Sequence, residues 1–405
     1  MEQLNHGASR TQVIDDFVSV TPWKAIASGE ATLDLSSSDT PTGKAMQMAF
    51  DFHGSGGFAV ARKELQLTLP AVFAIRFKLR GEAPVNHFEL KLVDETGKNV
   101  WWHQQRSIAF PNAWQEQIVK SRDIVFAWGP SGDASLSKLG AIELAITADQ
   151  GGKGTIWIAD LTLENRTLGA PPLITASSHE PKHEADASIL SASAKAWRTR
   201  RTSRQWLAID FRQCHEYGGL TLHWINKKAA RDFDVESSED GQTWTTLSRI
   251  RDAQEDRSFI PLPDGESRYL RLQLLRPQSS SGFGIRRIEV LPYQVTRTPE
   301  ALFAHIARTS PTGCYPRYLT GQQSYWTPVG TARGAPQALV NEEGLIELQP
   351  GSCSIEPFLF HEGRLITWAD AVTTTELADG FLPIPIVRWN AGDLTLTVTA
   401  CALDE

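Results

Sequence analysis

The 405-residue chain lacks the features that most directly mark a membrane or exported protein. It contains no run of about 18 apolar residues, so we expect no transmembrane helix. Its first residues, MEQLNHGASRTQVIDDF, have no apolar segment of the kind that a secretion signal requires. We favour a secreted, periplasmic or cell-surface protein whose signal is not part of this sequence, and the sequence leaves a cytoplasmic location open.

Basic residues are outnumbered by acidic ones, and cysteines are few. Lysine and arginine total 40 against 47 aspartates and glutamates, a formal net charge of −7, which argues against a nucleic-acid-binding protein. The four cysteines are widely spaced and form no CxxC pair, which argues against a zinc site. Cys314 and Cys353 could pair in an oxidising compartment, and the alternative is isolated thiols.

Signatures of catalysis are missing as well. The sequence has no GxSxG, HExxH, P-loop or Rossmann glycine pattern. Glu342, Glu343 and Glu356 could belong to a glycosidase site, but the two carboxylates of such a site meet in space, and their spacing in sequence does not identify them. Isolated acids in loops are usually solvated. The sequence therefore identifies no catalytic residue.

Tryptophan, by contrast, is abundant: the chain has 13 tryptophans and three methionines. Apolar and polar residues alternate with period two in many short runs, which predicts strands with one face in a core. Asp240-Gly241, between two such runs, predicts a hairpin turn. Only PEALFAHIAR (299–308) reads as a short helix. The clearest predicted strands are 65–79, 87–94, 142–149, 155–164, 204–211, 219–224, 232–240, 269–275 and 394–400.

Pro171, Pro172 and Gly169 interrupt the strand pattern in the linker NRTLGAPPL (165–173). We therefore expect three domains. Their predicted boundaries are 13–166, 174–293 and 294–405.

The second segment carries five motifs in a characteristic order: ASILSASAKAW (187–197), RQWLAIDF (204–211), DFDVESSEDGQTWTTL (232–247), RYLRLQLL (268–275) and GIRRIEV (284–290). With these motifs it resembles the discoidin domain, also called the coagulation factor five/eight type C domain. The resemblance implies an eight-stranded jelly roll of the galactose-binding type. Its members bind sugars, phospholipid head groups or proteins through loops at one end, so Arg198, Arg200 and Phe283 become candidate ligand contacts.

The first segment contains VIDDFVSVTPW (13–23), GKAMQMAFDF (43–52) and TIWIADLTLENR (155–166). With these it resembles bacterial carbohydrate-binding modules of the same galactose-binding-like superfamily.

Both resemblances imply a structural calcium ion. By position, the implied ligands are Asp16 and Asp160 in the first segment and Asp186 and Glu289 in the second. Calcium takes six to eight oxygen ligands, many from the backbone, so two acids in each domain are a weak signal, and solvated acids are the alternative.

Trp101 and Trp102 are consecutive in NVWWHQQR (99–106). Neighbouring residues of a strand face opposite sides, so one ring must leave the face that buries the other. An exposed indole can stack on a sugar ring, and His103 and Arg106 add hydrogen-bond donors. The alternative is that a loop or another domain covers the second ring. Further candidates are Trp114 and Trp128.

The stretch AKAWRTRRTSRQW (194–206) contains five basic residues and no acid. A solvated basic loop, an anionic-sugar contact and a nucleic-acid contact are all compatible with it, and we favour the solvated loop.

The last segment contains PRYLTGQQSYWTPVG (316–330) and RLITWADA (364–371). It weakly resembles the β-sandwich that precedes a helical-barrel catalytic domain in large bacterial glycoside-processing enzymes. We therefore expect the chain to be the N-terminal part of a longer protein, or an accessory subunit.

Together these observations predict an all-β protein with two galactose-binding-like jelly-roll sandwiches and a third, incomplete β domain. The leading hypothesis is a non-catalytic protein that binds an oligo- or polysaccharide, with structural Ca2+ and without nucleic acid. The alternatives are the N-terminal part of a glycoside hydrolase whose site lies in or after residues 294–405, and a cell-surface adhesion protein that binds protein or lipid. The sequence does not indicate an oligomeric state.

Overall fold

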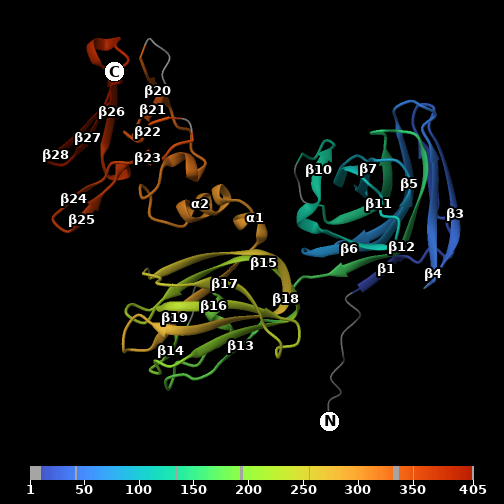
Figure 1. The fold of residues 1–405 in the computed structure, drawn as a ribbon, viewed down its shortest axis with the longest axis horizontal. Helices are drawn as coiled ribbons and strands as arrows, with labels where there is room; N and C mark the ends of the chain where they lie inside the picture. Colours follow the sequence, from blue (N-terminus) through green and yellow to red (C-terminus); the bar gives the residue numbers. More distant parts are fainter. Residues whose placement is uncertain are drawn as a thin grey trace. The chain divides into compact units, whose positions relative to one another are not determined.

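A computed structural model describes residues 11–403 except 42, 133–135, 192–194, 255, 332–336 and 350. Among these residues strands dominate, and the only α-helices are α1 (Tyr293–Thr296) and α2 (Pro299–Arg308) (Figure 1). The predicted all-β class and the predicted helix at 299–308 are confirmed. No helix in the described part of the chain is both long and apolar enough to cross a membrane.

The chain forms two compact units. One holds Met1–Pro171 together with Phe211–His215, and the other holds Pro172–Asp210 and Glu216–Glu405.

The first unit contains two six-stranded antiparallel sheets. The β6 sheet has the order β3 (Thr32–Thr40), β4 (Gly43–Asp51), β12 (Lys153–Asn165), β6 (Phe73–Glu82) and β9 (Gln115–Lys120), with β1 (Thr11–Asp15) paired to β12. The β8 sheet has the order β10 (Val125–Trp128), β8 (Val100–Ile108), β7 (Asn86–Asp94), β11 (Lys138–Thr147), β5 (Phe58–Thr68) and β2 (Trp23–Ala27).

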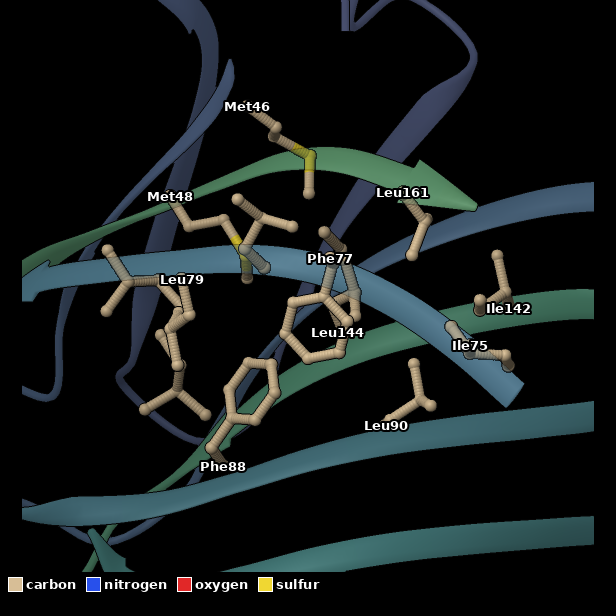
Figure 2. Packing of buried hydrophobic residues seen from close by; sticks show 14 of the residues in the cluster. Met46, Met48, Ile75, Phe77, Leu79, Phe88, Leu90, Ile142, Leu144 and Leu161 are labelled. Carbon is tan, nitrogen blue, oxygen red and sulfur yellow. The ribbon is translucent and has the colours of Figure 1, made fainter. Parts of the chain in front are cut away.

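Alternate residues of both sheets build one shared core. Figure 2 shows side chains of β4, β6 and β12 facing those of β7 and β11. Phe77 of β6 and Phe88 of β7 lie with ring centres 5.9 Å apart. Because the facing residues are fully buried, truncating a leucine here to alanine costs about 2–5 kcal/mol. The intervening residues of each strand must then lie on the outer faces.

The second unit begins with a seven-stranded sheet. Its order is β14 (Trp197–Thr199), β19 (Phe283–Leu291), β15 (Gln205–Trp224), β18 (Arg257–Pro277), β16 (Ala230–Ser238) and β17 (Thr245–Ile250), with β13 (Leu173–Ala176) paired to β15. The predicted hairpin is confirmed, since β16 pairs with β17 across Asp240-Gly241 and Gly241 adopts a left-handed φ of 73°. The Asp240 carboxylate accepts hydrogen bonds from the backbone N–H groups of Gln242 and Thr243, each at 2.8 Å.

Beyond the two helices, the second unit continues in small sheets around a limited core of Val329, Val340, Val387 and Trp389. The indole N–H of Trp389 donates to the carbonyl of Glu343 at 2.9 Å. The strands of these sheets are β20 (Trp326–Val329), β21 (Ala338–Asn341), β22 (Ile346–Glu347) and β23 (Ser354–Ile355), then β24 (Leu359–His361) and β25 (Arg364–Ile366), and finally β26 (Val372–Leu377), β27 (Pro385–Ala391) and β28 (Leu394–Thr399).

Short 3-10 turns connect several of these strands. They are η1 (Ser121–Asp123), η2 (Ala187–Leu190), η3 (Arg317–Thr320), η4 (Trp368–Asp370) and η5 (Ala378–Gly380).

Candidate functional site

The outer face of the β8 sheet carries an unusual set of side chains for a surface that does not contribute to the core. Strand β7 sends Phe88, Leu90 and Leu92 inward, so Glu89 and Lys91 lie on its other face. The strand register places Lys91 opposite Trp102 of β8 on one side and opposite Glu143 of β11 on the other. One row across the sheet therefore contains an aromatic ring, a cation and a carboxylate.

Two tryptophans form the aromatic part of this face. Trp102 of β8 is half-buried, and Trp128, the last residue of β10, is 47% exposed. Their rings meet edge to face, with centres 5.6 Å apart and an interplanar angle of 87°. Because Trp102 supports Trp128 from one side, the exposed ring is held in place and does not need to be ordered by a ligand.

A hydrogen-bonded chain of polar groups runs beside the two indoles. The Lys91 ammonium lies 2.9 Å from the Glu89 carboxylate and 5.6 Å from the centre of the Trp128 ring. Gln104 donates from Nε2 to Oε1 of Glu89 at 2.7 Å, and Arg106 donates from Nε to Oε1 of Gln104 at 2.7 Å. These groups therefore have fixed positions before any ligand arrives.

Glu89 and Lys91 are almost completely removed from solvent, with exposed fractions of 3% and 8%. A buried ion pair is often no more stabilising than apolar residues of the same size, because both charges lose their hydration. The pair is therefore weak evidence of a contribution to stability.

Further along the same face, charges neutralise one another. Arg62 of β5 bonds Glu143 from its NH1 atom at 2.6 Å and Glu64 from its Nε atom at 2.8 Å. The hydrogen bond from Arg62 lowers the pKa of the Glu64 carboxyl. Val93, Val100 and Ala141 form an apolar strip on this face, and Trp128 pairs with Val100 in the register.

The structure separates the candidates from the 99–106 stretch into two groups. Trp102 and Arg106 lie on the outer face, together with Gln104. Trp101 is buried on the core side, where its ring meets Phe126 edge to face at 5.4 Å. His103 also leaves the outer face, and its Nδ1 lies 3.3 Å from the Asp123 carbonyl. Trp114 is half-buried just before β9, which belongs to the other sheet.

The basic stretch of the second unit gathers around one acid. The Lys228 ammonium lies 3.1 Å from a Glu180 carboxylate oxygen, and the guanidinium groups of Arg198 and Arg200 lie 3.8 and 3.9 Å from that carboxylate. Burial opposes ionisation of Glu180, yet the bond from Lys228 and the nearby arginines lower its pKa. Arg198 also hydrogen-bonds His183, whereas the Arg200 side chain is 87% exposed.

Phe283 requires a correction, because it cannot be a ligand contact. Its side chain is completely buried at the start of β19, opposite Thr199 of β14. The sequence placed it in a loop, whereas the β14–β19 pairing turns it into the core.

Each of the four acids implied as calcium ligands has a partner within the protein. Asp160 pairs with Lys78 at 2.8 Å, and Asp186 caps η2 by accepting from the N–H of Ser188 at 2.8 Å. Glu289 is bound by His223 at 2.6 Å, and Asp16 accepts from the N–H of Val18 at 3.1 Å. Within the described ranges, no three His, Cys, Asp or Glu side chains gather to hold a metal ion.

A lysine binds Asp15, the residue before Asp16 in the sequence. The Lys63 ammonium donates to the Ile14 carbonyl at 2.8 Å and to the Asp15 carboxylate at 2.6 Å. The same carboxylate accepts from the Trp23 indole at 2.9 Å. A protein cation therefore already ties β1 to β5 here.

The acids of the last segment have distinct environments. Glu343 is buried and is bound by Arg317 and by the Asn341 amide, and burial raises its pKa. Burial and the nearby Glu343 charge raise the pKa of Glu356 to about 7.

Sequence reasoning missed the charged residues that complete the outer face, namely Arg62, Glu89, Lys91 and Glu143. The signal was present in HFELKLVD (87–94), where an acid and a base alternate with buried apolar residues. What the sequence lacked was the register that places them beside Trp102 and Trp128.

Comparison with known proteins supports the predicted discoidin-like identity of the second segment. Residues 173–288 match the family F5/8 type C domain, which confirms the resemblance to the discoidin domain. No curated protein matches the chain.

Among solved structures, the chain is similar to the family 11 carbohydrate-binding module of cellulase Lic26A-Cel5E of Clostridium thermocellum. The two are 17% identical with a TM-score of 0.33, and the match covers 39% of this chain and 96% of that chain. Chitosan-binding module 2 from a chitosanase/glucanase of Paenibacillus sp. IK-5, in complex with chitotriose, is 19% identical with a TM-score of 0.28. That match covers 31% of this chain and 99% of the module. The family 32 module of Clostridium perfringens NanJ, in complex with galactose, is 10% identical with a TM-score of 0.27. That match covers 30% of this chain and 93% of the module.

Proposed function

We propose that this protein binds carbohydrate without transforming it, and that the outer face of the β8 sheet is the main binding surface. The observation that carries the proposal is the pair Trp128 and Trp102, half-exposed and rigidly held beside a buried Lys91–Glu89 pair. A sugar ring has apolar CH faces and a rim of hydroxyls, and this surface offers a partner for each.

Each group has a defined task in this proposal. The Trp128 ring stacks on the CH face of one sugar unit. The Gln104 carbonyl accepts a hydrogen bond from a sugar hydroxyl, and Arg106 donates one, while the buried Glu89 carboxylate holds Gln104 and Lys91 in place. Because these side chains already hold one another in place, binding orders few of them and costs little conformational entropy.

The charges of the face favour a neutral glycan. Lys91 and Arg62 are each paired with carboxylates at 2.6–2.9 Å. A ligand that carries its own charge would have to compete with these pairs, whereas a hydroxyl can add to the Glu64 carboxylate, whose side chain is 54% exposed.

The F5/8 type C domain at residues 173–288 is proposed as a second binding module. The exposed Arg200 guanidinium is its candidate contact. Two weak sites on one chain raise the effective concentration of each for a long polymer, so the whole protein binds a polysaccharide more tightly than either unit alone. Since such polymers occur outside cells, we place the protein in a secreted, periplasmic or surface compartment.

A glycoside hydrolase is the second candidate, and the environment of Glu356 favours it. A carboxyl whose pKa is about 7 is suited to donate a proton near neutral pH. Its partner would be Glu343, whose charge contributes to that shift.

Two measurements on the full chain distinguish the two candidates. A glycan array measures binding, and chromogenic glycosides measure hydrolysis. We expect binding to a set of neutral glycans and no release of the chromophore. Binding to none of the glycans would contradict the proposal and favour adhesion to protein or lipid. Release of the chromophore that Glu356→Gln abolishes would establish the hydrolase.

A further inference from the structure

The second unit contains a small pocket that shares no residue with the surface proposed above. It has a volume of about 220 Å³, opens to solvent, and is lined by the end of α2, the segment around η3 and Trp368 of η4. An apolar cavity of about 150 Å³ holds a benzene ring. The pocket therefore matches one substituted six-membered ring.

The wall of the pocket is fixed by backbone packing. Gly313 adopts a φ of 89°, and a Cβ at this position would lie 2.0 Å from Oγ1 of Thr367. Only glycine therefore allows this loop to approach η4 so closely. Trp368 is held on the same side, because its indole N–H donates to the Tyr315 carbonyl at 3.2 Å and the Arg317 guanidinium lies 4.9 Å from its ring centre.

Arg308 supplies a positive charge at the rim. Among the described residues, no acid pairs with its exposed guanidinium. The described residues that line the pocket include no aspartate or glutamate at all. A second arginine, Arg257, donates to Ser310 Oγ in the wall at 3.1 Å. The pocket is thus electropositive.

The end of α2 does not cancel this charge. Helix C-termini present partly negative carbonyl groups. Here the Ile306 carbonyl accepts from Ser310 Oγ at 2.7 Å, and the His305 carbonyl accepts from Thr309 Oγ1 at 3.0 Å. Hydroxyl groups of the chain therefore already occupy these acceptors.

The remaining lining groups suit a polyhydroxylated ring. Thr312, Tyr315 and Gln322 are among the lining residues, and each has a side chain that can donate or accept a hydrogen bond. Trp368 adds an aromatic wall against which the CH groups of a sugar can pack.

We propose that this pocket binds a single acidic sugar unit, a pyranose that bears a carboxylate. The guanidinium of Arg308 binds the carboxylate with two charge-assisted hydrogen bonds. The ring packs on Trp368, and Thr312, Tyr315 and Gln322 bind its hydroxyls. A neutral sugar of the same shape leaves Arg308 unpaired and binds more weakly.

Ligand-observed NMR on the full chain tests this assignment with a matched pair of probes, methyl β-D-glucuronide and methyl β-D-glucoside. The two differ only at C6, which is a carboxylate in the glucuronide and a hydroxymethyl group in the glucoside. We expect saturable binding of the glucuronide that is at least about tenfold tighter than that of the glucoside. Arg308→Gln should lower the glucuronide affinity to that of the glucoside, while Arg297→Gln, an exposed arginine outside the lining, should leave it unchanged.

Several results would overturn the assignment. They are the absence of saturable glucuronide binding, equal affinity for both probes, and an Arg308→Gln protein that binds as the unaltered chain does. Competition by acetate at the same concentration as glucuronide would show that the pocket binds small carboxylates in general and does not recognise the sugar ring. A Trp128→Ala protein should retain glucuronide binding, so failure here is distinguishable from failure of the surface on the β8 sheet.

Discussion

At the scale of single residues, the ion pair of Glu89 and Lys91 is the feature of the outer face of the β8 sheet that substitutions test most directly. Both are buried charged groups, and they form an ion pair at 2.9 Å. Removing one of two buried partners leaves an uncompensated charge, whereas removing both does not.

This reasoning gives a stability prediction for the pair. Glu89→Leu should lower the free energy of unfolding by about 3–5 kcal/mol, because the Lys91 ammonium stays buried without its carboxylate. The double variant Glu89→Leu/Lys91→Met should lose clearly less stability while still losing glycan binding. Urea unfolding measures the first quantity, and a double variant as unstable as the single one would contradict the account.

Glu356 gives a second prediction at this scale, with a definite pH dependence. Its folded pKa is raised to about 7 from an ordinary 4.5, so its protonated form stabilises the fold at low pH. That stability is fully present below pH 4.5 and is lost as the pH rises through about 7. Glu356→Gln should therefore melt at the same temperature as the unaltered chain in acid and at a higher temperature in alkali. An equal melting temperature at all pH values would refute the raised pKa.

Some of the site was predictable residue by residue, and some was not. Alternation alone places Trp101 and Trp102 on opposite faces. It does not say which ring is buried, because that depends on which side of β8 meets the other sheet. Trp128 depends on the pairing of β10 with β8, and Phe283 on the pairing of β19 with β14. Both pairings join segments that are distant in sequence.

At the scale of secondary-structure elements, the β16–β17 hairpin shows how a turn is stabilised by one carboxylate. The N–H groups of Thr243 and Gln242 and the hydroxyl of Ser238 bind Asp240 and lower its pKa from 3.8 to about 2. Hydrogen bonds to an ionised carboxylate are stronger than those to a neutral group.

The hairpin should therefore weaken in acid. A lowered folded pKa adds stability above pH 3.8, and this stability is lost as the pH falls through about 2. Asp240→Asn should melt at a lower temperature than the unaltered chain at neutral pH, and the two should converge near pH 2. Glu239→Gln, at the exposed neighbouring acid, serves as the control. A difference that stays constant across this pH range would contradict the role of the charge.

Long strands were harder to predict than the hairpin. The sequence predicts separate strands at 204–211 and 219–224, whereas β15 runs continuously over Gln205–Trp224. The strand is kinked at Arg212, whose φ is 62°. Gly218 marks a close approach, since a Cβ there would lie 2.3 Å from the Cα of Tyr293. Glycine thus signals backbone proximity here and not a turn.

At the scale of the whole molecule, the all-β class and the discoidin-like segment followed from the sequence, because alternation and motif order are local signals. The calcium sites stay a prediction, since coordination depends on the environment of each acid. Here those acids bind protein donors, and Lys63 bridges β1 and β5.

We therefore expect the melting temperature of the full chain to be the same with EDTA and with millimolar Ca2+. An ion that binds only the folded state at about 100 times its dissociation constant adds about 2.7 kcal/mol, which raises the melting temperature by several degrees. A rise of that size on adding Ca2+ would show that the implied sites exist.

The central claim is that an exposed indole on the β8 sheet recognises sugar. Its most direct test is the dissociation constant of the full chain for the glycan with the strongest array signal, compared between Trp128→Ala and Trp157→Ala. Trp157 is half-buried on β12 of the opposite sheet, where the Arg80 guanidinium lies 4.8 Å from its ring centre, so it is a matched control. We predict that Trp128→Ala weakens binding about tenfold or more while Trp157→Ala leaves it unchanged. Equal dissociation constants for the unaltered chain and Trp128→Ala would contradict the account.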